Sequence, residues 1–122
     1  SFQMKQEQFA AIDTKTTPWE ASFNPKLGVA LGRLMLRKDP KTGAEIRMIR
    51  YPKGIVNPAH THPCGHGIFV LEGRLKTHRG TFGPGTWVWF PQGEVMEHGA
   101  TDEGDVTGIF ITDGAFEIYY RD

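Results

Sequence analysis

Four of the five histidines in this chain have the spacing of metal ligands. His60, His62 and His66 lie in the run HTHPCGH, and His98 follows 32 residues later. Residues i and i+2 of a strand point to the same face, so His60 and His62 are placed to hold one ion together. A bend at Pro63–Gly65 can bring His66 to the same point, and His98 would arrive from a distant strand. A lone histidine is more often an ordinary surface or core residue; the set of four predicts one divalent transition metal ion.

The ligand set restricts the metal without identifying it. Imidazole nitrogen suits Fe, Mn, Ni, Cu and Zn alike; we favour Fe or Mn, with the other three as alternatives. Each bound imidazole needs an acceptor for its free N–H. Glu97, beside His98, is one candidate, although a solvated loop carboxylate is an equally good interpretation. Cys64 is interpreted first as a small buried residue, and Cys64, Glu94 and Glu97 are the substitutes if His98 is not a ligand. The fifth histidine, His78, has no partner motif and is expected to be exposed.

Short strands separated by glycine turns must position these ligands. Fifteen glycines and eight prolines interrupt the chain too often for long helices. Residues 4–22 are less clear, and their segment QEQFAAI fits either a short helical turn or an edge strand. Regular spacing of about 8–12 residues predicts an all-β sandwich or barrel. The expected strands are residues 28–37, 44–51, 55–62, 67–71, 74–78, 86–90, 105–112 and 116–121.

Two of the expected strands carry further side chains of interest. Trp87 and Trp89 share one face of their strand and Phe90 takes the other, so one set would line a pocket, although plain core is the default for aromatic residues. Arg47 and Arg50 fall on opposite faces of theirs. Solvent exposure is the default for both, but one of them could enter the mouth of a barrel and bind a substrate anion.

The glycines and prolines around the histidines resemble the two motifs of the cupin family. The first motif matches as Gly54, IVNPA, His60-Thr61-His62, PCG, His66, GIFVLE, Gly73. The second matches as Gly85, TWVWF, Pro91-Gln92-Gly93, EVME, His98. The match covers about residues 28–112. It implies a single-domain cupin β-barrel, a double-stranded β-helix of the jelly-roll type, with the barrel at about residues 28–121.

This chain departs from the usual cupin pattern at two positions. His66 stands where most cupins carry a ligand Glu, so the resemblance is to the less common type with four histidine ligands, His60, His62, His66 and His98. Four residues separate Gly93 from His98, where the family usually has two, so this loop must bulge. The stretch KDPKTGAEIRMIRYPKG followed by HTHPCGHGIFVLEG resembles the ChrR-type branch. That branch includes the metal-binding domain of anti-sigma factors and relatives of aromatic-ketone dioxygenases.

Composition fits one compact domain spanning residues 1–122. The 14 basic and 14 acidic residues balance, so nothing indicates a nucleic-acid groove or a membrane-seeking face. No apolar run approaches the roughly 20 residues of a membrane span, and no signal peptide is visible. Residues 1–3, before Met4, are interpreted as a vector remnant. The single cysteine excludes an internal disulfide and favours a cytoplasmic location, and we expect a homodimer.

Two classes of function fit these features. The first, which we favour, is a small metal-dependent dioxygenase that cleaves a C–C bond in a diketone-like or phenolic ketone. Four neutral histidines leave the charge of the ion uncompensated, which favours an anionic or enolisable substrate. A non-redox isomerase or lyase would use the same ligands. The second class is a metal-binding sensor or ligand-binding module, as the anti-sigma resemblance implies.

Overall fold

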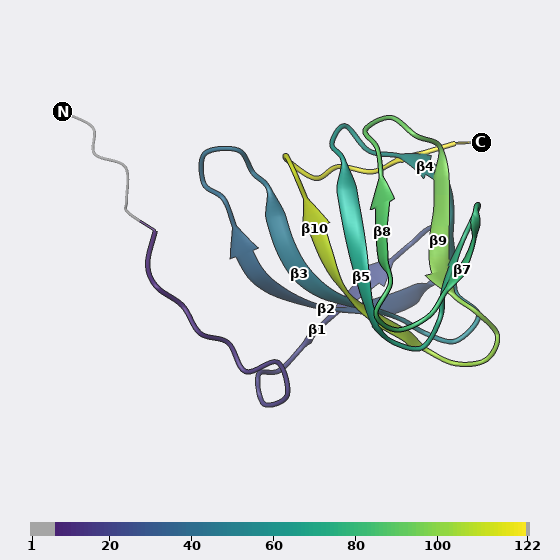
Figure 1. Ribbon diagram of the computed structural model, residues 1–122, viewed down its shortest axis with the longest axis horizontal. Coiled ribbons are helices and arrows are strands. Elements are labelled where there is room, and N and C mark those ends of the chain that lie inside the picture. The colour runs from purple at the N-terminus through teal and green to yellow at the C-terminus, as the bar shows by residue number, and fades with distance from the viewer. Residues whose placement is uncertain (1–6, 122) are drawn as a thin grey trace.

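The computed structural model describes residues 7–121, which form two antiparallel β-sheets (Figure 1). The first sheet has the strand order β1-β2-β3-β10-β5-β8 and the second has the order β11-β4-β9-β6-β7. The strands are β1 (Glu20–Asn24), β2 (Val29–Lys38), β3 (Glu45–Tyr51), β4 (Val56–Thr61), β5 (His66–Glu72), β6 (Leu75–Thr77), β7 (Gly80–Phe82), β8 (Trp87–Phe90), β9 (Met96–Ala100), β10 (Val106–Thr112) and β11 (Tyr119–Tyr120).

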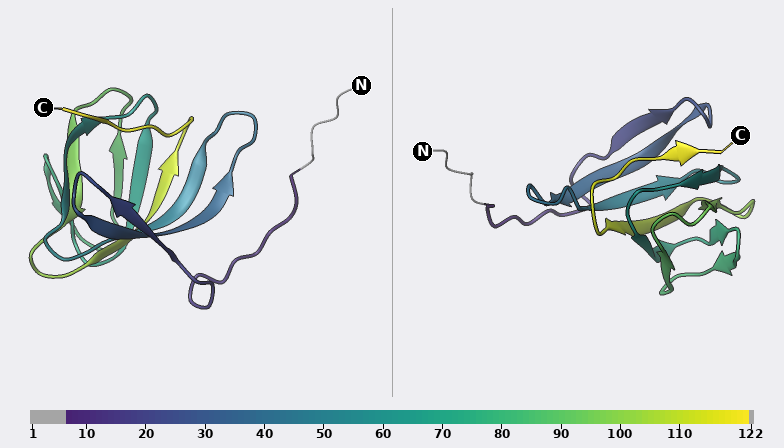
Figure 2. Two further views of the ribbon diagram at one scale, coloured as in Figure 1. Left: turned by 180° about the vertical axis from the view of Figure 1, so that it is seen from behind. Right: turned by 90° about the horizontal axis from the view of Figure 1, so that it is seen from above.

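All eight predicted strands have a counterpart among these elements, and the predicted all-β class is confirmed. The prediction for residues 116–121 was too long, because only Tyr119–Tyr120 pairs with β4. Three short strands, β1, β7 and β9, were not predicted as separate elements. The expectation that the segment QEQFAAI forms a short helical turn or an edge strand was wrong, because residues 7–12 of it have no regular structure and lie outside the two sheets, and the edge strand β1 begins only at Glu20 (Figures 1 and 2). The proposed vector remnant, residues 1–3, lies outside the described residues.

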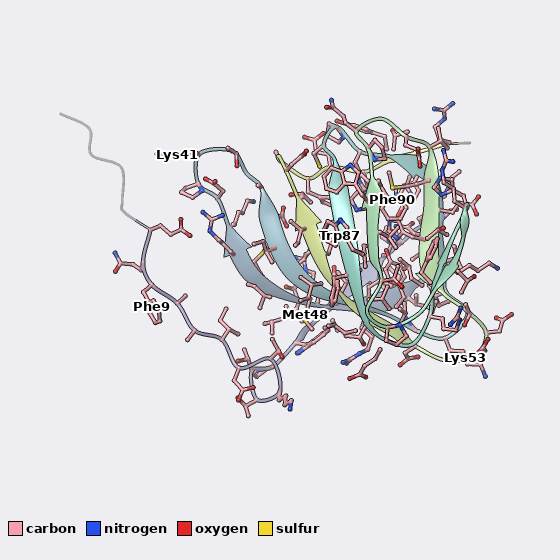
Figure 3. The ribbon with its side chains drawn as sticks, in the orientation of Figure 1. Phe9, Lys41, Met48, Lys53, Trp87 and Phe90 are labelled. Atoms are coloured by element: carbon pink, nitrogen blue, oxygen red, sulfur yellow. The ribbon has the colours of Figure 1, made fainter. Side chains whose placement is uncertain are left out.

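The two sheets face each other, and side chains from both form the core (Figure 2). Alternation along β8 decides which aromatic residues enter it. Phe90 is 2% exposed and belongs to the core, whereas Trp87 and Trp89 lie on the outer face and are 49% and 45% exposed. Figure 3 labels Trp87 and Phe90 on this part of the sheet. The tryptophans are therefore not pocket residues. Their rings lie over Gly67 and Gly65, where any Cβ would collide with an indole.

Apolar packing fills one end of the space between the sheets and leaves the other end open. Fully buried core residues come from β5, β6, β8 and β9, namely Ile68, Val70, Leu75, Phe90 and Met96. The opposite end, between β1, β2, β3 and the segment leading to β11, contains a cavity instead. The four histidines of the sequence pattern lie at the boundary between core and cavity. No helix among residues 7–121 is long and apolar enough to cross a membrane.

Candidate metal centre

An irregularity in β4 turns its polar residues inward. Asn57 and His60 are three positions apart, and an odd spacing places two residues of a regular strand on opposite faces. The pairing of β4 with β9 shifts register between these two residues, at Pro58 and Ala59. This shift restores the inward direction, because Asn57 is 4% exposed, His60 is 0% exposed and His62 is 2% exposed. The sequence spacing alone does not reveal this step.

The turn between β8 and β9 accommodates the long spacer before His98. Gly93 has a φ of 79°, the left-handed region that favours glycine. Its N–H donates to the His62 carbonyl oxygen at 3.2 Å, and the Glu94 N–H donates to the Pro91 carbonyl oxygen at 3.2 Å. The two extra residues are thus taken up in a turn that is tied to the first motif. β9 then places His98 opposite Asn57 of β4.

Three histidines converge at this point. One ligand atom from each of His60, His62 and His98 lies within 4.8 Å of the others. The Nε2 atoms of His60 and His98 are 3.2 Å apart. All three residues are buried, and they come from two neighbouring strands of one sheet and the bend that follows β4. The convergence of His60, His62 and His98 agrees with the sequence prediction.

Backbone carbonyl groups determine which nitrogen of two rings carries the proton. His60 Nδ1 is 2.7 Å from the Pro58 carbonyl oxygen, and His62 Nδ1 is 2.5 Å from the Glu117 carbonyl oxygen. A carbonyl oxygen only accepts, so each Nδ1 must donate, and each Nε2 keeps a lone pair. The Nε2 of His62 is buried without a hydrogen-bond partner. A buried lone pair of this kind beside two further imidazoles fits a divalent transition metal.

Tyr51 on β3 supports His98. Its hydroxyl is 3.2 Å from His98 Nδ1. The hydroxyl oxygen can accept the Nδ1 proton that His98 must carry when its Nε2 binds metal. Glu97 is exposed on the opposite face of β9. The group that faces His98 Nδ1 is therefore the Tyr51 hydroxyl, and Glu97 is a solvated carboxylate, the other of the two interpretations that the sequence allowed.

His66 lies beside the cluster but is not one of its three members. Its ring centroid is 4.6 Å from that of His62 and 5.5 Å from that of His98. Its Nε2 is 2.9 Å from the Met96 sulfur, and its Nδ1 is buried without a partner. The ring stacks on Phe90 at 4.7 Å with an interplanar angle of 17°. The structure thus supports a set of three histidines, and a fourth ligand at His66 stays a prediction.

A cavity of about 650 Å³ opens beside the cluster, and His62 and His98 form part of its wall. Its apolar lining comes from both sheets and includes Leu31, Ile49, Phe110, Phe116 and Ile118. A volume of this size suits a small organic molecule. The cluster therefore sits where a bound molecule can reach it.

The family comparison covers most of the chain. The family model described as the ChrR cupin-like domain matches residues 7–117. The chain belongs to the ChrR cupin-like family. No curated protein sequence matches this cupin.

Solved structures agree with the fold. An RmlC-like cupin protein from Ralstonia eutropha JMP134 has a TM-score of 0.78 at 22% identity, over 94% of this chain and 73% of that one. A chain from the complex of Rhodobacter sphaeroides SigE with the anti-sigma ChrR has a TM-score of 0.67 at 20% identity. The match covers 83% of this cupin and 52% of that chain, so this cupin corresponds to about half of it.

A third structure comes from Methylibium petroleiphilum PM1 and is described as a candidate acetylacetone dioxygenase. Its TM-score is 0.73 at 12% identity, over 90% of this chain and 81% of that one. At such identities the likeness establishes the fold alone. The jelly-roll cupin fold expected from the sequence motifs is confirmed.

Burial keeps the four histidines at this centre, His60, His62, His66 and His98, neutral. Loss of hydration lowers the pKa of His62 to about 4 and that of His66 to about 2. Desolvation also lowers the pKa of His60, and that of His98 falls well below its usual value because burial and the neighbouring histidines both disfavour its charge. A metal ligand must be unprotonated. The cluster is therefore in its ligand form at neutral pH before any ion arrives.

The remaining side chains singled out in the sequence lie around the centre. Cys64 is 4% exposed and is not part of the histidine cluster, as expected for a small buried residue. The Glu94 carboxylate accepts hydrogen bonds from Arg79 and contacts His78 at 2.9 Å. On β3 the two arginines separate as predicted: Arg47 is 8% exposed and lines the cavity, whereas Arg50 is exposed.

Proposed function

We propose that this cupin binds one divalent transition metal through His60, His62 and His98, with His66 as a fourth ligand. The observation that carries the proposal is the unpartnered, buried Nε2 of His62 beside the paired Nε2 atoms of His60 and His98. Fe or Mn is the metal we favour, with Zn, Ni and Cu as alternatives. Imidazole binds all five, so the protein residues alone do not choose among them.

We further propose that the protein is a dioxygenase that cleaves a C–C bond in a diketone-like or phenolic ketone. A bound divalent metal would act as a Lewis acid toward an enolate or ketone oxygen and, if redox-active, would supply electrons to dioxygen. In such a cleavage both oxygen atoms of O₂ enter the products, one in each fragment. The likeness to the Methylibium petroleiphilum protein described as a candidate acetylacetone dioxygenase supports this class.

The residues around the cavity contribute three things to this chemistry. Tyr51 and two backbone carbonyl groups orient the imidazoles before substrate arrives, so little reorganisation is needed. Phe110 and Phe116 limit water at the end of the cavity beside His62 and His66. The low pKa of His62 and His66 keeps both imidazoles neutral, so the charge of a bound divalent ion would stay uncompensated and would favour an enolate-like, anionic ligand.

Oxygen consumption tests the proposed reaction. Protein reloaded with Fe or Mn is incubated with acetylacetone, longer β-diketones and 2-hydroxyaryl ketones, and with analogues of each type that carry a carboxylate, while dissolved oxygen is recorded. We expect one substrate class to consume one O₂ per molecule cleaved, and we expect His60→Ala to abolish uptake because it removes a ligand at the centre of the cluster. Absence of uptake across the panel by protein that demonstrably holds metal would contradict the enzyme assignment.

The alternative is a metal-binding sensor module. It is favoured by the family itself and by the likeness to a chain from the SigE complex with anti-sigma ChrR. A sensor would hold metal without turnover, and loss of the metal would change its affinity for a protein partner. Disappearance of a panel substrate without oxygen uptake would instead indicate the non-redox isomerase or lyase.

Three further expectations from the sequence stay proposals. We expect one domain over residues 1–122, a homodimer and a cytoplasmic location. The cytoplasmic location rests on the single cysteine, Cys64, which is buried and free. Sedimentation of the purified chain tests the homodimer directly.

A further inference from the structure

The cavity beside the histidines is positively charged. Of the side chains described as lining it, three are cations, Lys26, Arg33 and Arg47, and none is a carboxylate. The remaining lining is largely apolar or aromatic. A cation surrounded by apolar groups has lost hydration that only an anion or a set of polar partners can replace. The charge of the lining therefore indicates that the cavity takes an anionic organic molecule.

Arg47 is the cation placed deepest in this lining. It is 8% exposed, and its guanidinium carbon lies 4.5 Å from the ring centroids of both Phe110 and Phe116. Two flanking rings hold the guanidinium in place, which prepares its fork of donors for a planar partner. Its Nε is buried without a hydrogen-bond partner, and its only described ion pair joins Nη1 to Glu45 at 3.5 Å, the outer limit of a hydrogen bond. Arg47 thus has donor capacity left unused.

The other two cations lie nearer the solvent. The Arg33 side chain is 39% exposed and pairs with Glu20 at 3.3 Å. Lys26 is exposed, and its ammonium lies 5.5 Å from the Tyr120 ring centroid. Both residues are suited to attracting an anion toward the cavity. Arg47 is the one cation of the three that offers a buried hydrogen-bond donor inside the cavity.

One aromatic ring connects Arg47 to the metal centre. Phe116 contacts the His62 ring with 4.8 Å between centroids, and the same Phe116 ring contacts Arg47. A molecule that reaches both the histidines and Arg47 therefore needs an oxygen at one end, an anion at the other and an apolar body between them. A carboxylate matches the planar fork of arginine with two parallel hydrogen bonds.

We propose that Arg47 binds the carboxylate of the substrate, so that the substrate is an oxo-carboxylic acid whose ketone or phenolic oxygen faces the histidines. This inference deepens the proposed function, since it rests on the same cavity being the substrate site. It narrows the proposed diketone-like or phenolic ketone substrates to those that carry a carboxylate, and it makes Arg47 a substrate-binding residue. The apolar lining distinguishes an organic acid from a free inorganic anion.

Binding to metal-free protein tests the inference separately from the reaction. The probes are benzoate and phenylacetate, their uncharged amides, and inorganic phosphate, each titrated by calorimetry. We expect a carboxylate to bind about tenfold or more tightly than its own amide, since a hydrogen-bonded charge pair inside a protein contributes that much. Phosphate should bind more weakly than the carboxylate. A failed oxygen-uptake assay leaves this comparison unaffected.

Variants of β3 locate the effect. Arg47→Gln should remove the preference for carboxylate over amide, and Arg47→Lys should retain only part of it because the fork is lost. Arg50→Gln is the matched control, since Arg50 is exposed and bonds Thr107 Oγ1 at 3.0 Å. Glu45→Gln should tighten carboxylate binding, because it removes the anion that competes for Arg47.

The proposal is overturned by any of four results. One is that neither carboxylate binds the parent protein better than its amide. A second is that Arg47→Gln keeps the preference, and a third is that Glu45→Gln weakens it. The fourth is that phosphate binds as tightly as the organic acids.

Discussion

At the residue scale, the centre depends on where protons sit on four imidazoles. The carbonyl groups of Pro58 and Glu117 take the Nδ1 protons of His60 and His62 and so free their Nε2 atoms. His98 has no such carbonyl partner and relies on the Tyr51 hydroxyl. An imidazole whose outer N–H lacks a partner is a weaker and less oriented ligand. The Tyr51 hydroxyl is accordingly the most informative group to remove.

Tyr51→Phe should lower metal affinity by about 10–100-fold, in the range of losses from outer partners of metal-binding histidines. The change deletes only the hydroxyl and keeps the buried ring, so the fold should persist with a stability loss of about 1–2 kcal/mol. Competitive titration with a metal-binding dye measures the affinity. Tyr119→Phe is the matched control, because Tyr119 is exposed and its hydroxyl bonds Glu117. Equal metal affinities in the two variants would mean that the Tyr51 hydroxyl does not support metal binding by His98.

His66→Glu tests the fourth ligand. If His66 binds metal, the variant restores the commoner cupin ligand set, keeps both metal and fold, and loses affinity for anionic ligands because the net charge of the site falls by one. Without metal, a carboxylate stacked between Phe90 and Phe110 lacks a partner, and the protein should be destabilised by several kcal/mol. Thermal unfolding with and without metal, together with azide titration, gives both readouts. Unchanged azide affinity in metal-loaded protein would mean that His66 is not a ligand.

The sequence predicted the histidines at the centre but not the groups that hydrogen-bond to their rings. Spacing on a strand pairs His60 with His62, and the motif brings in His98. Tyr51 lies nine residues before His60 in an unrelated strand, so no local pattern connects it to the site. Periodicity placed Arg47 and Arg50 on opposite faces of β3, yet only the packing of the two sheets determines which face is inward.

At the element scale, the geometry of the centre depends on the close approach of β4 and β9. Gly99 of β9 lies opposite Val56 of β4, and a Cβ at Gly99 would come within 2.2 Å of the Ile55 carbonyl oxygen and 2.5 Å of the Val56 Cα. Both are backbone atoms, so they cannot avoid the added Cβ by a change of side-chain rotamer. The same strand pair positions His60 and His98, so strand spacing and ligand spacing are coupled.

Gly99→Ala should therefore reduce both stability, by about 3 kcal/mol or more, and metal affinity, because it pushes β4 away from β9. Gly67→Ala provides the comparison. There the added Cβ meets the Trp87 indole at 2.1 Å, but that side chain is half exposed and can swing outward. We expect about 1 kcal/mol of destabilisation and normal metal affinity. Urea unfolding measures the stability of both variants, and metal titration measures their metal affinity. Equal metal affinity in the two variants would mean that the spacing of β4 and β9 does not control the geometry of the ligands.

The strands themselves were more predictable than their ends. Long alternating stretches such as β2, β3 and β10 were expected within one or two residues of their observed bounds. β7 and β9 were missed because GTF and MEHGA contain glycine and little alternation, and their pairing with β6 comes from tertiary packing. The register shift of β4 beside Pro58 also could not be predicted from the sequence, although this shift turns both Asn57 and His60 inward.

At the scale of the whole molecule, burial of uncharged histidines makes folding depend on pH. Metal-free protein should lose stability as pH falls below about 6.5, because the unfolded chain then binds protons that folded His62, with a pKa of about 4, and His66, with a pKa of about 2, do not. Each such histidine lowers the free energy of unfolding by up to about 1.4 kcal/mol for every unit by which the pH falls. Urea unfolding at pH 7.5, 6.5 and 5.5 measures the slope. A flat profile would mean that the folded protein can protonate these rings.

The metal content of the reloaded protein tests the central claim most directly. Metal-free protein is incubated with Mn²⁺ or Fe²⁺, desalted and subjected to elemental analysis, alongside His98→Ala treated in the same way. We predict about one ion per chain in the parent and a large loss in His98→Ala, with unchanged far-ultraviolet circular dichroism because apolar packing between the sheets maintains the fold. Absence of stoichiometric metal in the parent under every loading condition would contradict the account.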